Sequence, residues 1–280
     1  MIYTLQPTNT VFDMDTQFPE LTPNKYVGIL LSGGMESSLV TLLAQMKYGK
    51  ENVLCFYNDA IFSSNKPEVN DRIRANIKRA EDNLGVTITY LESNYEYHIS
   101  NRTDSVTQGF VKMQELYNLE YLFWGVTKLF FEVEPFRQPN LSRADVHHII
   151  GNDMEKYHST YEEFHIATDM YTDLLLQIDI PAEVYPLLRN NTGFLRAPFD
   201  IINKSEVVDF YRQLGLLDIL AKTTSCISNE MFLTGKHCGQ CFNCQQRSDS
   251  FDILGSVTDK TEYLTDVVIQ RRQALLEKIK

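Results

Sequence analysis

The sequence has little positive charge: its 26 Lys and Arg residues stand against 37 Asp and Glu residues, which gives a formal net charge of −11. Broad, non-specific binding to nucleic acid or to acidic membranes needs a positive surface, so this balance argues against both. Apolar runs of the roughly eighteen residues that span a bilayer are also missing. The first thirty residues hold three prolines, three acidic residues and one lysine, which is unlike a signal or transit peptide. These absences favour a cytosolic protein.

Two common phosphate-binding motifs are missing as well, because neither Gly-x-x-x-x-Gly-Lys-Ser/Thr nor Gly-x-Gly-x-x-Gly occurs. In their place, an uncharged apolar run at 27–31 ends in Ser-Gly-Gly, and apolar residues with helical spacing follow. The pattern predicts a strand, a glycine turn and a helix. Glycines let backbone N–H groups approach an anion, and the helix N-terminus adds further donors. The alternative is a tight turn without a ligand. The residues expected to bind a nucleotide are Ser32, Gly33, Gly34, Met35, Glu36, Ser37 and Ser38.

The rest of the chain alternates between two kinds of pattern. Apolar runs predict further strands at 52–57, 86–91, 120–125 and 193–197. Helical spacing of apolar residues predicts helices at 68–84, 106–118, 158–177 and 203–214. This alternation indicates an α/β fold with a Rossmann-like parallel sheet, in which ligands bind beyond the carboxyl ends of the strands. Gly125 lies at such an end, where it either admits the nucleotide or simply terminates the strand. Residues 1–25 are expected to form an irregular leader that packs on the main domain. Residues 134–157 are expected to form a long excursion, that is, a long loop without a clear helical or strand pattern.

Four of the five cysteines gather near the C-terminus, in the order Cys226-x11-Cys238-Gly-x-Cys241-x2-Cys244. Four thiolates with such spacing can surround a tetrahedral zinc ion, which would be structural because no coordination position stays open. Disulfides are the alternative, but they belong to oxidising compartments, and nothing in the sequence indicates export. The remaining cysteine, Cys55, lies in an apolar strand and is expected to be a small core residue.

The run Asn203-Lys204-Ser205-Glu206 has the pattern of a capping box, in which Asn203 caps a helix and Glu206 reaches back to it. Lys204 then lies in the first helical turn, where a positive charge is slightly unfavourable beside the positive end of the helix dipole. A solvated lysine is one interpretation of this position, although the helix dipole makes it slightly unfavourable.

The glycine turn resembles the Ser-Gly-Gly-x-Asp-Ser loop of the ATP pyrophosphatase (PP-loop) superfamily, with Glu36 where that pattern has Asp. Members of the superfamily use ATP to activate a carbonyl or carboxylate oxygen, which a nitrogen or sulfur nucleophile then displaces. The resemblance implies that ATP binds together with Mg²⁺. It also implies catalytic roles for Glu36, Ser37 and Lys204.

The order of the glycine turn, Pro198-x5-Lys204 and the run from Ser225-Cys226 to Cys244-x2-Arg247 is similar to that in 7-cyano-7-deazaguanine (preQ0) synthases, over roughly residues 26–255. This resemblance implies an ATP-binding domain at 26–222, a zinc module with a C-terminal helix at 223–280, one structural Zn²⁺ per chain and a homodimer. It also implies that Lys204 reaches the phosphates of ATP, and that the protein is a carbon–nitrogen ligase of queuosine biosynthesis. Such an enzyme converts 7-carboxy-7-deazaguanine, ammonia and ATP to the nitrile.

The substrate segment departs from that family. The family pattern, roughly Tyr-Pro-Asp-Cys-Arg-x-x-Phe, corresponds here to residues 157–164, with Ser159 and Tyr161 in place of Asp and Arg. Tyr157 and Tyr161 are expected to contact the substrate, and Glu162 or Glu163 to replace the missing acid. Two other functions stay open. One is ATP-dependent modification of a different carboxylate or carbonyl, on a nucleotide or on a protein. The other is a nucleotide-binding interaction module without turnover.

Overall fold

The computed structural model describes residues 1–58, 67–91, 113–125, 127, 193–226, 231, 234–239 and 242–264. Several predictions made from the sequence lie outside these residues: the excursion at 134–157, the helix at 158–177, most of the final helix, Cys241, and the substrate residues Tyr157, Tyr161, Glu162 and Glu163. Within the described ranges, no helix combines the length and the apolar character needed to cross a bilayer.

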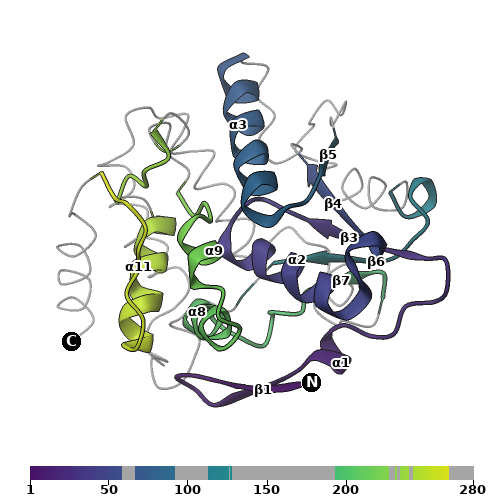
Figure 1. Ribbon diagram of the computed structural model, residues 1–280, viewed down its shortest axis with the longest axis horizontal. Coiled ribbons are helices and arrows are strands. Elements are labelled where there is room, and N and C mark those ends of the chain that lie inside the picture. The colour runs from purple at the N-terminus through teal and green to yellow at the C-terminus, as the bar shows by residue number, and fades with distance from the viewer. Residues whose placement is uncertain are drawn as a thin grey trace, which may run out of the picture.

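The centre of the fold is a five-stranded sheet in which every pairing is parallel (Figure 1). The strands, in spatial order, are β5 (Ile88–Leu91), β4 (Val53–Asn58), β3 (Tyr26–Leu30), β6 (Leu119–Trp124) and β7 (Leu195–Arg196). The chain builds outward from β3 on one side and then adds β6 and β7 on the other. Ligands of such sheets bind where the strand order reverses, which is here between β3 and β6. The predicted α/β class is confirmed.

Helices connect the first strands and cover the sheet. α2 (Met35–Tyr48) begins directly after the glycine turn and packs on β3, β4 and β6 (Figure 1). A short 3-10 helix, η1 (Lys50–Asn52), leads into β4, and α3 (Pro67–Leu84) precedes β5. Their apolar faces join the strands in one core, as the helical spacing predicts. Buried members of this core include Val27, Ile29, Leu39, Val40, Leu43, Ile73, Ala80 and Leu84.

Residues 2–17 form regular elements, so the prediction of an irregular leader over 1–25 is wrong for them, whereas residues 18–25 contain no helix or strand. β1 (Ile2–Leu5) and β2 (Thr10–Asp13) form an antiparallel hairpin, and the short helix α1 (Met14–Gln17) follows. One side of the segment is apolar and joins the main core through Leu5, Phe12, Met14 and Phe18. Each strand is only four residues long, and an alternation this short does not distinguish a strand from a loop.

The hairpin is fastened to helix α8 (Lys204–Gln213), which lies above β1 in the view of Figure 1. The backbone N–H of Gln6 donates a hydrogen bond to Asp209 Oδ2 at 2.9 Å. The rings of Tyr3 and Phe210 pack with their centroids 4.5 Å apart. The N-terminal segment therefore helps to place the helix whose first residue is expected to face the phosphates.

The last described elements surround the cysteines. α9 (Leu217–Ala221) leads into the cysteine region, and α11 (Phe242–Leu254) packs beside α8 (Figure 1). Arg247 on α11 is fully buried, and its guanidinium donates to Leu220 O at 2.7 Å and to the Thr223 hydroxyl at 2.8 Å. A buried charge needs an opposite partner, and Asp259 Oδ2 lies 3.4 Å from Arg247 Nε. Arg247 thus ties together segments before, within and after the cysteine region.

Candidate functional site

The glycine turn lies at the carboxyl end of β3, at the point where the strand order reverses. Gly33 has a φ of 81°, a left-handed conformation in which a side chain would be strained. Gly34 is the N-cap of α2 and has no side chain with which to cap it. The first N–H groups of a helix have no partner within the helix, so α2 presents backbone donors at this turn.

Two serine hydroxyls hold the turn together. The Ser37 hydroxyl accepts a hydrogen bond from the N–H of Ser32 at 3.2 Å and lies 3.1 Å from Ser32 Oγ. Ser32 Oγ in turn accepts from the N–H of Gly34 at 3.3 Å. The side chains of Met35 and Ser38 are buried, so any contact between these two residues and a nucleotide is left to their backbone.

Two residues outside the turn also hold it, and neither belongs to a motif recognised in the sequence. Asn76 on α3 donates from Nδ2 to Ser32 O at 2.7 Å, and the N–H of Thr224 donates to Gly33 O at 2.8 Å. Asn76 is buried, and a polar residue within an apolar helical stripe is a signal that could have revealed it. Thr224 gives no such signal, because any residue except proline supplies the same backbone N–H.

Gly125, which follows β6, is explained by helix packing. A Cβ atom at this position would lie 2.4 Å from the backbone nitrogen of Ser37 and 2.8 Å from its Cα. Only glycine therefore lets α2 begin directly over the end of β6. This reason differs from both alternatives that the sequence suggests, since the missing side chain makes room for the protein's own backbone.

Lys204 lies beside Glu36, with Nζ 3.1 Å from Glu36 Oε1, and both side chains are only 15% exposed. Its Nζ also donates a hydrogen bond to Gln246 Oε1 at 2.8 Å. Partial burial strengthens such a charge pair, because water screens it less than at the surface. The structure thus brings Glu36, Ser37 and Lys204 together at one end of the sheet, although their catalytic roles stay predictions.

Helix α8 has a fixed start and a direct link to α2. The predicted capping box is confirmed, since Asn203 and Glu206 each accept backbone N–H groups at the beginning of the helix. Further along α8, the hydroxyl of Tyr211 donates to Met35 O at 2.9 Å. Burial raises the pKa of Tyr211 well above its ordinary value, so the phenol stays protonated and can donate. Both features hold Lys204 in place relative to the turn.

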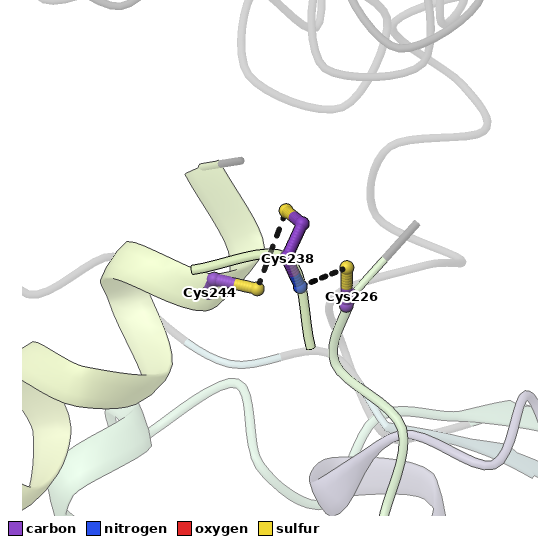
Figure 2. A group of neighbouring side chains, drawn as sticks. All are labelled: Cys226, Cys238 and Cys244. Atoms are coloured by element: carbon purple, nitrogen blue, oxygen red, sulfur yellow. Dashed lines mark hydrogen bonds between the residues drawn. The ribbon is translucent and has the colours of Figure 1, made fainter. Parts of the chain in front are cut away.

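Three cysteines converge, as their spacing predicts (Figure 2). Cys226 and Cys238 come from loop segments, and Cys244 comes from α11. The three sulfur atoms lie within 4.8 Å of one another. The N–H of Cys238 donates to Cys226 Sγ at 3.3 Å, and the sulfurs of Cys238 and Cys244 are 3.9 Å apart. A disulfide has its sulfurs about 2.05 Å apart, so this pair is not bonded.

This donor set fits a metal ion. Sulfurs that bind one tetrahedral zinc ion at about 2.3 Å lie about 3.8 Å from each other, close to the 3.9 Å between Cys238 and Cys244. Thiolates also hold iron–sulfur clusters, and in the four-iron kind each cysteine sulfur binds a different iron and lies farther from the others. Burial, together with the nearby Arg247, lowers the pKa of His237 to about 4, so this neighbour of Cys238 carries no charge at neutral pH.

Comparison with known proteins bears mainly on the second half of the chain. The sequence model of the family described as queuosine biosynthesis protein QueC matches residues 157–255, roughly a third of the 280 residues. Among solved structures, the chain is similar to U34-tRNA thiolase NcsA from Methanococcus maripaludis, which was solved with its 4Fe-4S cluster. The identity is 14% and the TM-score 0.42, and the alignment covers 91% of this chain and 82% of that chain. A comparison with curated protein sequences gives no match.

The family match begins at Tyr157, where the divergent substrate segment also begins, and ends at Gly255, directly after α11. It therefore includes that segment, Lys204 and the cysteine motif, but not the glycine turn. The predicted resemblance to a family of queuosine biosynthesis is confirmed over these residues. Over residues 157–255 the chain is thus similar to the QueC family, and the glycine turn lies ahead of the matching region.

Proposed function

We propose that the chain is an ATP-dependent enzyme that activates a carboxylate for attack by ammonia. Its proposed substrate is 7-carboxy-7-deazaguanine, and its product is the nitrile 7-cyano-7-deazaguanine. The observation that carries the proposal is the ion pair between Lys204 and Glu36 beside the glycine turn. Lys204 belongs to the part of the chain that matches QueC, so the pair joins that part to the turn. A lysine beside a glycine turn and a helix N-terminus is suited to the phosphates of ATP.

Each group at the turn has its own role in this proposal. The backbone N–H groups at the start of α2 bind phosphate oxygens, and the Ser37 hydroxyl keeps the turn in the required conformation. Lys204 stabilises the negative charge that develops on the departing pyrophosphate. Glu36 supplies a carboxylate oxygen, the kind of ligand that the Mg²⁺ accompanying ATP prefers.

The reaction has two activation steps. Attack of the substrate carboxylate on the α-phosphate of ATP forms an acyl-AMP and releases pyrophosphate, and ammonia then attacks the acyl carbon, so that AMP and a proton leave and the amide remains. A second ATP activates the amide oxygen, whose loss together with the amide protons leaves the nitrile. Both steps need the same arrangement at the turn, since each develops charge on a leaving pyrophosphate.

The cysteine cluster is proposed to bind one Zn²⁺ per chain, through Cys226, Cys238 and Cys244 together with Cys241. The separation of the described sulfurs supports a single ion. Four sulfur ligands leave no open coordination position, so the ion would stabilise the fold and take no part in the reaction. Metal analysis of freshly purified protein tests this assignment, and iron in place of zinc would indicate a cluster.

The proposed function is tested by incubating purified protein with ATP, ammonia and 7-carboxy-7-deazaguanine and detecting the nitrile by mass. Conversion that requires all three reactants, and that is lost in Lys204→Met, supports the proposal. ATP consumption with a different carboxylate or carbonyl only would refute the substrate and leave the ligase class. ATP binding with no consumption would indicate an interaction module. If the nitrile forms, its loss in Glu162→Gln or Glu163→Gln identifies the relocated acid.

A further inference from the structure

Gln246 links the cysteine region to Lys204. It lies on α11, two residues after Cys244, and its Oε1 accepts a hydrogen bond from Lys204 Nζ at 2.8 Å. The residue is only 6% exposed, and α11 packs against α8, the helix that carries Lys204. Because the amide is buried at this helix contact, its hydrogen bond is shielded from water.

The contacts of Lys204 restrict the direction of its ammonium group. An ammonium has three N–H donors and no acceptor. One donor is taken by Gln246 Oε1 at 2.8 Å, and the carboxylate of Glu36, with Oε1 3.1 Å from Nζ, attracts the ammonium as an ion pair. These two contacts restrict where the remaining donors point. Lysine otherwise loses much side-chain entropy when it binds a ligand. A lysine side chain that is already ordered in the free protein binds the phosphates more tightly, because little further entropy is lost on binding.

A glutamine suits this position because it accepts a hydrogen bond without adding charge. A second carboxylate would also orient the ammonium, but it would place another negative charge near the triphosphate. An aliphatic side chain of similar length would leave Lys204 with Glu36 alone. Glutamine is thus the side chain that orders Lys204 and leaves its positive charge available to the phosphates.

We propose that Gln246 is the positioning residue of Lys204 and sets the affinity for ATP without touching the nucleotide. This inference rests on the ATP site proposed above. Gln246 is carried by the helix that also carries Cys244, so the cysteine region determines where the amide lies. An intact cysteine region is therefore a condition for an ordered Lys204.

The test measures the Kd for ATP by calorimetry, with thermal unfolding as the check on folding. The cost of ordering one long side chain on binding corresponds to a rise in Kd of about twofold to tenfold, which we expect for Gln246→Met. Gln246→Glu is also expected to bind ATP more weakly, but its loss should shrink at high salt, because salt screens the added repulsion. Gln213→Met is the matched control, because Gln213 lies at the other end of α8 and donates to Thr4 O.

A double-mutant cycle with Lys204→Met separates positioning from a general effect on folding. If Gln246 acts through Lys204, Gln246→Met causes no further loss in the Lys204→Met background. Additive losses, or an unchanged Kd in Gln246→Met, overturn the inference. If Gln246→Met fails to fold, the Kd for ATP of Gln246→Glu is measured at low and high salt instead. An unchanged affinity for ATP, or a loss of affinity that does not depend on salt, overturns the inference. Wild-type protein that binds no ATP would instead refute the proposed function, and this inference with it.

Discussion

Lys204 Nζ and Glu36 Oε1 lie 3.1 Å apart, which joins the start of α8 to the start of α2. A carboxylate in the first turn of a helix is favourable, whereas a lysine there is not. The negative charge of Glu36 offsets the electrostatic cost of placing Lys204 at the start of α8. The contact also requires a side chain at position 36 that is long enough to reach Lys204. A glutamate at this position is therefore matched to the lysine that faces it.

Shortening Glu36 to aspartate should weaken the site, even though aspartate is the residue in the PP-loop pattern. The carboxylate would retreat by one methylene, and Lys204 would lose one of its two partners. We expect about a tenfold lower rate of ATP turnover in Glu36→Asp, the effect of one weakened contact between partly buried charges. Release of pyrophosphate measures the rate. Glu115→Asp, at an exposed residue before β6, is the control, and a faster Glu36→Asp enzyme would show that the site is not adapted to glutamate.

Removing the Ser37 hydroxyl should weaken ATP binding and leave the fold intact. This hydroxyl accepts from the N–H of Ser32 and fixes the turn. A neutral hydrogen bond contributes about 1 kcal/mol, so we expect about a fivefold rise in the Kd for ATP and a fall of a few degrees in Tm. Thr41→Val is the control, because it removes a buried hydroxyl one turn later in α2. Equal losses of ATP affinity in both variants would contradict a specific role for Ser37.

Replacing Cys226, Cys238 or Cys244 by serine should lower the metal content and the Tm together, because metal binding and folding are coupled in such modules. Elemental analysis and calorimetry measure the two quantities. Cys55 is an internal control: burial raises the pKa of its thiol to about 12, so it should resist alkylation at neutral pH. The cluster cysteines should become reactive after treatment with a chelator. Alkylation of Cys55 before the others, or metal-free wild-type protein, would refute the prediction.

The Arg247–Asp259 pair should make stability depend on pH in acid. Burial raises the pKa of Asp259, but the Arg247 guanidinium and hydrogen bonds from Tyr263 and Thr261 outweigh it, so the pKa lies below its ordinary value of 3.8. The stabilisation is therefore complete above that ordinary value and is lost as the pH falls through the lowered one. At neutral pH, Asp259→Asn should reduce the free energy of unfolding by about 3 kcal/mol.

Unfolding by urea from pH 7 down to pH 2 measures this dependence. The difference between the wild-type protein and Asp259→Asn should shrink toward zero at the acid end. Asp218→Asn serves as the control, because the side chain of Asp218 is 89% exposed where it meets Lys260, and exposed pairs contribute little. A difference that stays constant over the whole range would exclude titration of Asp259 as its cause.

The turn, α2 and the capping box could be predicted because each depends on residues that are close in the sequence. An apolar run, two glycines and a helical repeat are enough for a strand, a turn and a helix. Asn203 and Glu206 fix the start of α8 in the same way, through bonds within one helical turn. The convergence of the cysteines also follows from local spacing, since Cys238 and Cys244 are six residues apart.

The partners that hold the site could not be predicted, because they depend on how distant elements dock. Gln246 reaches Lys204 only because α11 packs on α8. Thr224 reaches Gly33 through its backbone, which carries no sequence signal. Gly125 could not be explained from the sequence, because a glycine at a strand end is compatible with a nearby ligand and with a nearby helix. The structure shows the helix contact, and the contact with a nucleotide stays a prediction.

The N-terminal hairpin has a consequence for the order in which the protein can be completed during synthesis. Gln6 bonds to Asp209, a residue 203 positions later, so the hairpin emerges from the ribosome long before its partner helix exists. Until then Tyr3 and Phe12, whose rings pack on Phe210 of α8 in the finished core, lack this partner. Such non-local contacts slow folding and leave apolar surface exposed in the nascent chain. The hairpin, although it is made well before α8, is thus among the last parts to reach its final place.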